Sequence, residues 1–301
     1  MERKQDRAWQ QAIRCLSPPR AAALAALDGQ DGIEELRLRA GLPPSVRRAG
    51  REEGLVMPPV TAEELRDTLS RAARWSVHSH TDSLRNGFVT LAGGHRLGVC
   101  GQAATENGQV AAIRGVSSLN LRVARQHPAL AAQIAPWIGT GAPQSALLVS
   151  PPGLGKTTLL REWVRLISDR GYPVAVADER SEVAALAGGA PQFAVGRCTD
   201  VLDGCAKKQA ALMLLKTMSP ALLAFDEITA PADVEAVSLC AHCGVAVLAT
   251  AHAADTDGLR RRPLYRRLLA LGVFRRAVFI GWKGKERVYR MEEWEESICS
   301  S

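Results

Sequence analysis

The chain has 301 residues, which is enough for two domains that each have a hydrophobic core. Its content of 47% hydrophobic and 23% charged residues is typical of a globular protein and not of a disordered one. No segment has the ~20 consecutive apolar residues of a membrane-spanning helix, and the charged start of the chain does not resemble a secretory signal. We therefore expect a cytoplasmic protein.

The net charge of +7 and the pI of about 9.2 favour an acidic partner, such as an anionic membrane surface or a nucleic acid. The seven cysteines are an odd number, and a cytoplasmic chain of this size is not expected to have a disulfide framework. Cys240 and Cys243 have CxxC spacing, which supplies half of a tetrahedral zinc site. Buried thiols are the favoured interpretation and zinc is the alternative.

The first part of the chain mixes helical and strand patterns. Residues 1–30 suggest helices only. Residues 61–77 have the pattern of an amphipathic helix, with Thr61 as N-cap and Glu64 as its capping-box partner. Apolar runs at 88–91 and 97–100 flank a Gly-Gly turn and predict a hairpin, and further short strands are predicted at 110–113 and 119–123. We expect a smaller α+β domain over residues 1–126.

From about residue 127 the pattern becomes an alternation of strands and helices. A helix is predicted from Pro128 to about Ile138, followed by a loop. The pattern that comes next consists of short apolar runs separated by helical stretches. It is typical of buried parallel strands joined by crossover helices. The predicted strands cover residues 147–149, 174–176, 222–225 and 245–248. We expect an α/β domain with a parallel sheet over residues 127–301.

The segment from Ser150 to Thr157 matches the phosphate-binding P-loop motif, except that Ser150 stands where the motif has Gly. Glycines allow backbone N–H groups to surround phosphate oxygens, the lysine neutralises the β- and γ-phosphates, and the following hydroxyl ligates Mg²⁺. The next helix adds the partial positive charge of its N-terminus. We expect ATP to bind to Pro152, Gly153, Leu154, Gly155, Lys156, Thr157 and Thr158.

Acidic and histidine residues follow the later strands of this domain. The second strand ends in Asp178-Glu179-Arg180-Ser181-Glu182, the third in Asp226-Glu227 and the fourth in Ala249-Thr250-Ala251-His252. The carboxyl ends of parallel strands face the crevice where ligands bind. Asp226 follows four apolar residues, as in a Walker B motif, and is expected to hold Mg²⁺ through water. Each segment alone is also compatible with a helix N-cap or a structural histidine.

The order of P-loop, acidic box, Walker B and histidine box resembles the ATPases of type II and type IV secretion and of pilus retraction. Within this superfamily the chain is most similar to the stage III sporulation protein AA family. The resemblance covers residues 34–288, nearly the whole chain. The segments that carry it are FVTLAGGHRLGVCG (88–101), IRGVSSLNLRVAR (113–125), DERSE (178–182), DVLDGC (200–205), MSP (218–220) and DEI (226–228).

The resemblance implies a RecA-like P-loop NTPase domain and catalytic roles for several residues. Glu182 would orient or deprotonate the attacking water, with Glu179 as second candidate. Glu227 would support the water or the metal shell, and His252 would sense the γ-phosphate. Lys156 belongs to the same catalytic set. Three arginines of the first domain are further candidates for closing over the nucleotide, with plain surface positions as the alternative. They are Arg114, Arg122 and Arg125.

Two positions depart from the family pattern. One is Ser150. The other follows Ile228, where the family usually has an arginine within two residues and this chain has Thr229 and Ala230. We expect turnover to be slow or partner-dependent if that arginine relays nucleotide state between subunits.

The resemblance implies a Mg²⁺-dependent ATPase that forms a homo-oligomer, with a hexamer as the expected ring. It would power or assemble a membrane-embedded secretion-like complex during endospore formation, at the inner face of a mother-cell membrane. The alternatives are a nucleic-acid-stimulated RecA-like motor, which the histidine box and the first-domain segments argue against, and a small-molecule kinase, which leaves Asp226-Glu227 without a role.

An arginine cluster near the C-terminus is predicted to face a partner subunit or an anionic membrane. Nucleic acid is the less favoured partner, because the cluster lacks the aromatic residues that stack on single-stranded bases. The cluster consists of Arg260, Arg261, Arg262, Arg266, Arg267, Arg275 and Arg276.

Overall fold

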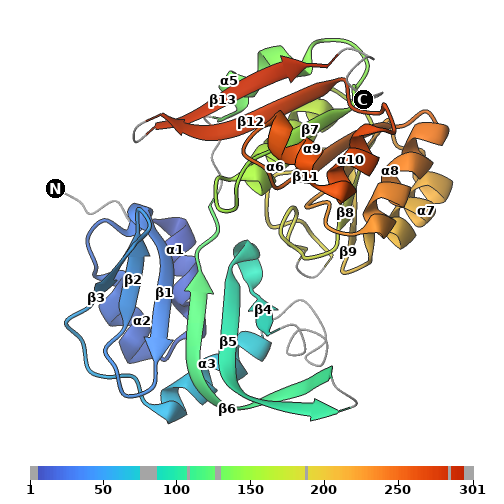
Figure 1. Ribbon diagram of the computed structural model, residues 1–301. Helices are drawn as coiled ribbons and strands as arrows, with labels where there is room; N and C mark the ends of the chain where they lie inside the picture. The colour runs from blue at the N-terminus through green and yellow to red at the C-terminus, as the bar shows by residue number, and fades with distance from the viewer. Residues whose placement is uncertain are drawn as a thin grey trace. The chain divides into compact units, whose positions relative to one another are not determined.

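The computed structural model describes residues 6–74, 87–106, 109–125, 130–186, 189–283 and 286–294 (Figure 1). The contacts within the chain divide it into two units. The N-terminal unit consists of residues 1–125 and 185–192, and the C-terminal unit of residues 126–184 and 193–301. No helix in the described residues is both long enough and apolar enough to cross a membrane.

The N-terminal unit is an antiparallel sheet of strand order β3-β2-β1-β6-β5-β4 with helices packed against it. Its helices are α1 (Arg7–Ala12), η1 (Ile13–Cys15), α2 (Pro18–Ala25), η2 (Gln30–Gly32), α3 (Ala62–Arg74) and η3 (Ala92–Gly94). Its strands are β1 (Ile33–Arg39), β2 (Ser45–Arg48), β3 (Arg51–Gly54), β4 (Phe88–Thr90), β5 (Arg96–Glu106) and β6 (Gln109–Arg122).

The core of this unit lies between the helices and the sheet. Trp9, Leu36 and Leu121 are fully buried in it, and Trp9 Nε1 donates to the Leu24 carbonyl over 3.0 Å. The buried indole N–H therefore has its partner, so that the ring is placed in the core without leaving a polar group unsatisfied.

The predicted hairpin of the N-terminal unit is confirmed as the antiparallel pair β4 and β5. The helix predicted over 61–77 is confirmed as α3 up to residue 74, and residues 75–77 lie outside the described residues. Thr61 Oγ1 accepts from the Glu64 N–H over 3.0 Å, but the Glu64 carboxylate binds Arg20. Residues 110–113 and 119–122 are strand, as predicted, but they belong to the single strand β6 and not to two short strands.

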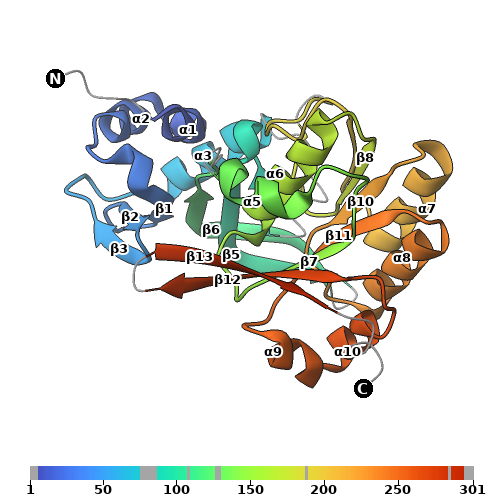
Figure 2. The same cartoon turned by 90° about the horizontal axis from the view of Figure 1, so that it is seen from above.

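The C-terminal unit is an α/β domain, in which helices lie on the faces of one β-sheet (Figure 2). Its helices are α5 (Leu130–Ile138), α6 (Lys156–Asp169), α7 (Lys207–Thr217), α8 (Pro231–His242), α9 (Thr256–Arg261) and α10 (Pro263–Leu269). Its strands are β7 (Ala146–Val149), β8 (Val174–Asp178), β9 (Thr199–Asp203), β10 (Leu222–Phe225), β11 (Ala246–Ala251), β12 (Arg276–Lys283) and β13 (Glu286–Glu293).

The strand order of the C-terminal unit is β13-β12-β7-β11-β10-β8-β9, and among its described strands only β13 runs antiparallel to its neighbour. The four predicted strands are confirmed as β7, β8, β10 and β11. Every residue of β7, β8 and β10 is buried, as the continuous apolar runs predict. The predicted helix from Pro128 is confirmed as α5 from Leu130 onward, whereas Pro128 itself lies outside the described residues.

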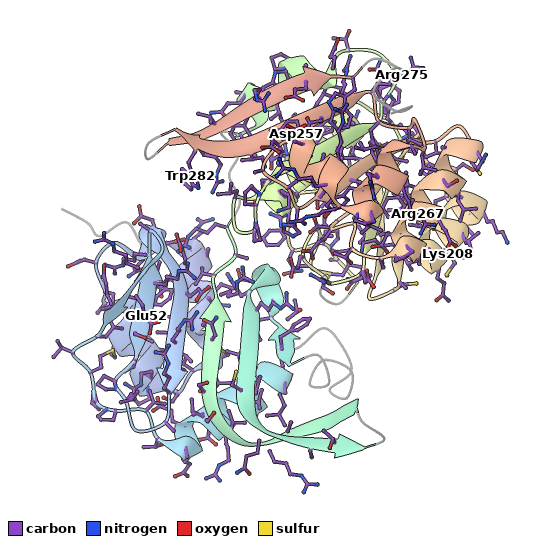
Figure 3. All side chains as sticks on the ribbon, in the orientation of Figure 1. Glu52, Lys208, Asp257, Arg267, Arg275 and Trp282 are labelled. Carbon is purple, nitrogen blue, oxygen red and sulfur yellow. The ribbon has the colours of Figure 1, made fainter. Side chains whose placement is uncertain are left out.

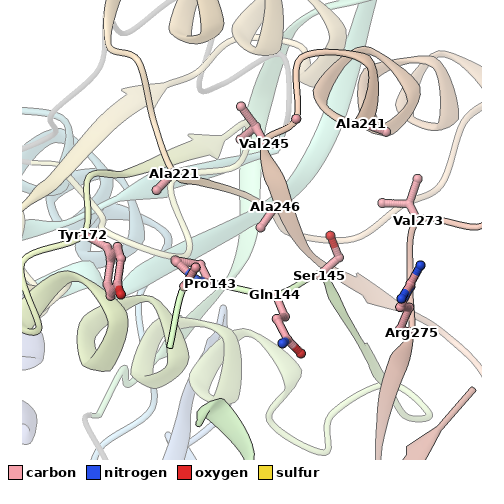
Figure 4. Close-up of a pocket in the computed structure, with 12 residues that line it drawn as sticks. Pro143, Gln144, Ser145, Tyr172, Ala221, Ala241, Val245, Ala246, Val273 and Arg275 are labelled. Atoms are coloured by element: carbon pink, nitrogen blue, oxygen red, sulfur yellow. The ribbon is translucent and has the colours of Figure 1, made fainter. Parts of the chain in front are cut away.

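An open cavity of about 670 Å³ lies where several strands of this sheet begin (Figure 4). Ser145 precedes β7, Ala221 precedes β10, and Ala246 begins β11, and all three line the cavity. Parallel α/β sheets bind ligands at the other edge, where the strands end. The candidate site is therefore built at that other edge.

Candidate nucleotide-binding site

Four loops of the C-terminal unit leave the sheet at one edge. The P-loop follows β7, the acidic box follows β8, Asp226 and Glu227 follow β10, and His252 follows β11. These strands are neighbours in the order β7-β11-β10-β8 and run parallel. The topology thus brings together residues that are up to about a hundred positions apart in the sequence.

The P-loop has the backbone conformation that its glycines permit. Gly153 has φ +78° and Gly155 has φ +87°, values that favour glycine. Ser150 is not among the positive-φ positions of the described residues, so the motif's first glycine is not required here for backbone conformation. Ser150 is fully buried, and its Oγ donates to the Pro151 carbonyl over 2.7 Å. The departure from the motif is therefore accommodated within the loop.

Lys156 begins α6 and is buried, with 6% of its surface exposed. Its ammonium donates to the Ser150 carbonyl over 3.2 Å, to Ser150 Oγ over 3.3 Å, to the Pro151 carbonyl over 3.2 Å and to His252 Nδ1 over 3.0 Å. Burial lowers the pKa of Lys156, and the nearby charges of Asp226 and Glu227 oppose that shift. The lysine is thus held in the loop, close to the two acids that follow β10.

Asp226 is joined to two hydroxyls. Thr157 Oγ1 donates to Asp226 Oδ2 over 2.7 Å, and Thr250 Oγ1 donates to Asp226 Oδ1 over 2.8 Å. The Thr250 hydroxyl also accepts from the Glu227 N–H over 2.8 Å. Thr250 is fully buried, and it fixes the backbone after β10 from β11. Thr250 lies in the histidine box, but no role of its own was predicted for it.

Glu227 lies in the left-handed region, with φ +56°, and its carboxylate has two partners. One is His252 Nε2 and the other is the guanidinium of Arg180 from the acidic box. Because Lys156 donates to Nδ1, His252 donates from Nε2 to Glu227. Burial alone would raise the pKa of Glu227, but the His252 hydrogen bond and the charges of Arg180 and Lys156 hold that pKa below its usual value.

The acidic box folds around Asp178, which is 1% exposed. Its carboxylate accepts the N–H groups of Glu182 and Ala184, each over 2.8 Å, and of Val183 over 3.1 Å. Burial raises the pKa of Asp178 to about 6, and the Asp203 charge adds to the shift, whereas the N–H donors oppose it.

Arg161 of α6 also binds the backbone of this loop. It donates to the carbonyls of Glu182 and Val183 over 2.7 and 2.6 Å. Burial lowers the pKa of Arg161 to about 10, and its guanidinium lies 3.7 Å from the centre of the Phe193 ring. The backbone of the candidate base Glu182 is therefore fixed by both Asp178 and Arg161, and neither was predicted to have this role.

Glu179 of the acidic box forms an ion pair with helix α7. Its carboxylate pairs with Lys207, the first residue of α7, which is 3% exposed and lies 3.9 Å from Asp233. A buried ammonium requires an acid nearby, so this pair has a structural role in the conformation described. Its predicted catalytic role stays a prediction.

The three arginines of the N-terminal unit differ in their surroundings. Arg125 donates to Asp6, to the Ile33 carbonyl and, over 2.7 Å, to the Gln30 carbonyl, so it ties together the start of this unit. Arg114 is exposed on β6, and Arg122 lies 4.0 Å from Glu35 with 61% of its side chain exposed. Their predicted action on the nucleotide stays a prediction.

A family model described as "Sporulation stage III, protein AA" matches residues 13–291. The chain belongs to this family. Stage III sporulation protein AA of Bacillus subtilis (strain 168) is 38% identical over 241 residues, which are 78% of either chain. Protein SEEDLING PLASTID DEVELOPMENT 1 of Arabidopsis thaliana is 26% identical over 254 residues, which are 83% of this chain and 34% of that relative. The resemblance predicted from the sequence is confirmed.

Solved structures of a pilus retraction motor and of an ATPase share the fold of this sporulation protein AA family member. The pilus retraction motor PilT, solved with bound ADP, is 18% identical, with a TM-score of 0.59 over 89% of this chain and 82% of that one. The ATPase DotB of Legionella pneumophila is 14% identical, with a TM-score of 0.58 over 89% of this chain and 78% of that one. The expected P-loop fold with a smaller α+β part before it is confirmed.

The residues at this edge of the sheet fit a nucleotide with Mg²⁺. A Cβ at Gly153 would meet no atom within 4 Å, so the loop backbone is open at this point. Thr157 and Asp226 present hard oxygen ligands next to each other, which is the donor set that Mg²⁺ prefers. Thr157 would contact Mg²⁺ directly and Asp226 through water, as the sequence predicts.

Proposed function

We propose that the chain is an ATPase of the secretion type, which hydrolyses ATP to ADP and phosphate. The observation that carries this proposal is the connected set of hydrogen bonds from Thr157 through Asp226 and Thr250 to Glu227. That set joins the P-loop to the strand ends where a reacting γ-phosphate would lie. A P-loop alone binds phosphate, whereas the added acids and histidine supply groups for hydrolysis.

The P-loop backbone and Lys156 bind the phosphates of the substrate. The Lys156 ammonium now has oxygen and nitrogen acceptors from its own chain, and phosphate oxygens replace some of them when ATP binds. Mg²⁺, when bound by Thr157 and Asp226, neutralises charge on the phosphate oxygens.

Glu182 orients the attacking water and takes its proton. The water oxygen forms a bond to the γ-phosphorus while the bond from that phosphorus to the bridging oxygen breaks, which leaves ADP and phosphate. Asp178 and Arg161 support this role, because they fix the backbone on which Glu182 stands. Glu227 and His252 report the presence of the γ-phosphate through the contact of His252 with Lys156.

We further propose that the chain acts as a ring-shaped homo-oligomer, a hexamer, on a membrane-embedded complex of sporulating cells. Its place is the cytoplasmic face of that membrane. Relatives in the sporulation protein AA family support the sporulation role, and the fold shared with PilT and DotB supports the motor type. The Glu227 carboxylate already has an arginine partner in Arg180, which supplies positive charge near the position where the family's arginine after Ile228 is missing.

Part of the C-terminal arginine cluster is available for docking. Arg262 donates to the His252 carbonyl over 2.7 Å, and Arg276 donates to the Trp137 carbonyl over 3.0 Å, so both have structural roles. The exposed members on α9 and α10 are Arg260, Arg261, Arg266 and Arg267, the last labelled in Figure 3. We propose this exposed set as the surface toward an anionic membrane or a partner subunit. Charge reversal at Arg261 and Arg266 is expected to release the chain from the membrane complex, and unchanged association would contradict the docking role.

The proposed function is tested by ATP turnover across a range of protein concentrations, with Lys156→Ala and Glu182→Gln as controls. A specific activity that rises with concentration, and that both substitutions abolish, supports a ring with sites completed by neighbours. Activity that is independent of concentration argues against assembly-dependent sites. Turnover that rises several-fold with DNA or RNA, and falls steeply with salt, would instead favour the nucleic-acid motor.

A further inference from the structure

The C-terminal hairpin of β12 and β13 brings an arginine onto the P-loop. A Cβ placed on Gly155 would lie 2.9 Å from Arg287 Nη1 and 3.4 Å from Arg287 Cζ. The guanidinium therefore lies against the loop backbone immediately before Lys156. Arg287 stands near the start of β13, more than a hundred residues from the motif. Neither this strand nor a role for Arg287 was predicted from the sequence.

Arg287 has an incomplete set of partners in this position. Its Nε is buried and has no hydrogen-bond partner, and within the described part of the chain Arg287 forms no ion pair. Its charge lies close to the N-terminus of α6, where the helix dipole is positive. An unpaired cation at this place is electrostatically unfavourable unless an anion joins it. The surroundings therefore favour a negatively charged ligand.

Trp282 lies directly across the hairpin from Arg287. The two residues are register partners of β12 and β13, and the Arg287 guanidinium is 5.6 Å from the centre of the Trp282 ring. Trp282 is 56% exposed, and Figure 3 shows its side chain at the end of the hairpin. An exposed indole beside an arginine offers an apolar face and a positive charge side by side, which suits a base attached to phosphates.

We propose that the hairpin completes the nucleotide site: Arg287 donates hydrogen bonds to the phosphate chain held by the P-loop, and Trp282 packs against the nucleobase. This inference rests on the proposed ATPase function and adds two specificity-determining residues to it. Arg287 contacts the phosphates of the ligand, and Trp282 contacts its base. Loss of the arginine weakens binding of any polyphosphate, whereas loss of the indole weakens binding only of ligands that carry a base.

The test measures equilibrium binding of ATP and of inorganic tripolyphosphate by calorimetry, in the same Mg²⁺ buffer. Arg287→Ala is expected to weaken both ligands by about 10- to 100-fold, because a charge-assisted hydrogen bond is lost. Trp282→Ala is expected to weaken ATP by about tenfold and to leave tripolyphosphate unchanged. Arg290→Ala is the matched control, since Arg290 is an exposed arginine of the same strand whose partner is Glu292.

The outcomes separate this inference from the proposed function. If the wild type binds ATP, Lys156→Ala does not, and both hairpin variants bind like Arg290→Ala, then the hairpin inference is overturned and the ATPase proposal stands. If neither the wild type nor any variant binds ATP, the proposed function itself fails. If Arg287→Ala does not fold, Arg287→Gln replaces it, provided that its thermal unfolding midpoint equals that of the wild type. The same loss of affinity for ATP and for tripolyphosphate is expected of this variant.

Discussion

The hydroxyl of Thr157 donates a hydrogen bond to Asp226 Oδ2 over 2.7 Å, and so joins the first turn of α6 to the residue that follows β10. The two residues come from the two motifs that define a P-loop NTPase site. Their contact is between the oxygen atoms that would hold Mg²⁺, one directly and one through water. The two motifs are therefore joined by a direct hydrogen bond between side chains.

Asp226→Asn is expected to lower the affinity for Mg²⁺-ATP while leaving the affinity for ATP in EDTA within about twofold. The amide keeps the size of the side chain but removes the charge that stabilises the metal shell, and loss of such a charge typically costs about 10- to 100-fold in metal-dependent binding. Calorimetric titrations with and without Mg²⁺ measure both values. Asp257→Asn, at an exposed acid of α9 (Figure 3), is the control, and an equal loss in the two buffers would contradict the metal assignment.

Thr250→Val is expected to destabilise the C-terminal unit by about 1–3 kcal/mol, because the hydroxyl that serves Asp226 and the Glu227 N–H is removed from a fully buried position. Valine has nearly the same shape as threonine, so packing is kept. Thr250→Ser keeps the hydroxyl and is expected to retain the hydrogen bonds. Denaturant unfolding of the three proteins measures the difference, and a valine variant as stable as the wild type would show that these bonds contribute little.

Ser150→Gly restores the P-loop motif and is expected to bind ATP within about twofold of the wild type, because Ser150 does not need a glycine conformation. The substitution is expected to cost about 1 kcal/mol of stability through the added freedom of the unfolded chain. Binding by calorimetry and unfolding by denaturant check the two parts. A large gain in affinity for the glycine variant would show that the serine impairs the loop.

His95 makes the N-terminal unit sensitive to acid. Its side chain is 1% exposed, and Nδ1 accepts from the Ala124 N–H over 3.1 Å, so it is neutral in the folded state. Burial, aided by the charge of Arg125, lowers the pKa of His95 to about 4 from 6.5. The folded protein thus binds fewer protons than the unfolded chain between these values, and its stability falls as the pH drops through 6.5 toward 4.

By pH 5 this group is expected to have removed about 2 kcal/mol of unfolding free energy relative to pH 7.5. His95→Gln keeps an acceptor for Ala124 but does not titrate. The difference in unfolding free energy between the wild type and His95→Gln is therefore expected to change with pH between 6.5 and 4 and to be constant above pH 7.5. Denaturant unfolding at several pH values measures it. Parallel pH profiles for the two proteins would contradict the role assigned to His95.

The central motifs of the C-terminal unit were predictable from the sequence because their signals are local. The apolar run at 222–225 became β10 with the predicted bounds, and the glycines of the P-loop have the positive φ that the motif requires. The side-chain partners were not predictable, because they depend on which strands are neighbours. The pairing of Glu179 with Lys207, and of Glu227 with Arg180, follows from the strand order, for which a single sequence has no pattern.

The elements that were missed lack apolar periodicity or turn signals. β13 contains several charged residues and runs antiparallel at the sheet edge, where one face needs no apolar side chains. Arg287, which this strand brings to Gly155, was missed for the same reason. The long strand β6 was divided in two because Gly115 and two serines interrupt its hydrophobic pattern, whereas pairing with β5 carries the strand through them.

Binding and hydrolysis, measured together, test whether the chain is a P-loop ATPase with Glu182 as its base. Phosphate release from Mg²⁺-ATP is measured for the wild type, Glu182→Gln and Lys156→Ala, beside the binding of ATP to each. We expect release by the wild type, binding without release by Glu182→Gln, and neither by Lys156→Ala. Release by Lys156→Ala at the wild-type rate, or none by the wild type at any protein concentration, would contradict this assignment.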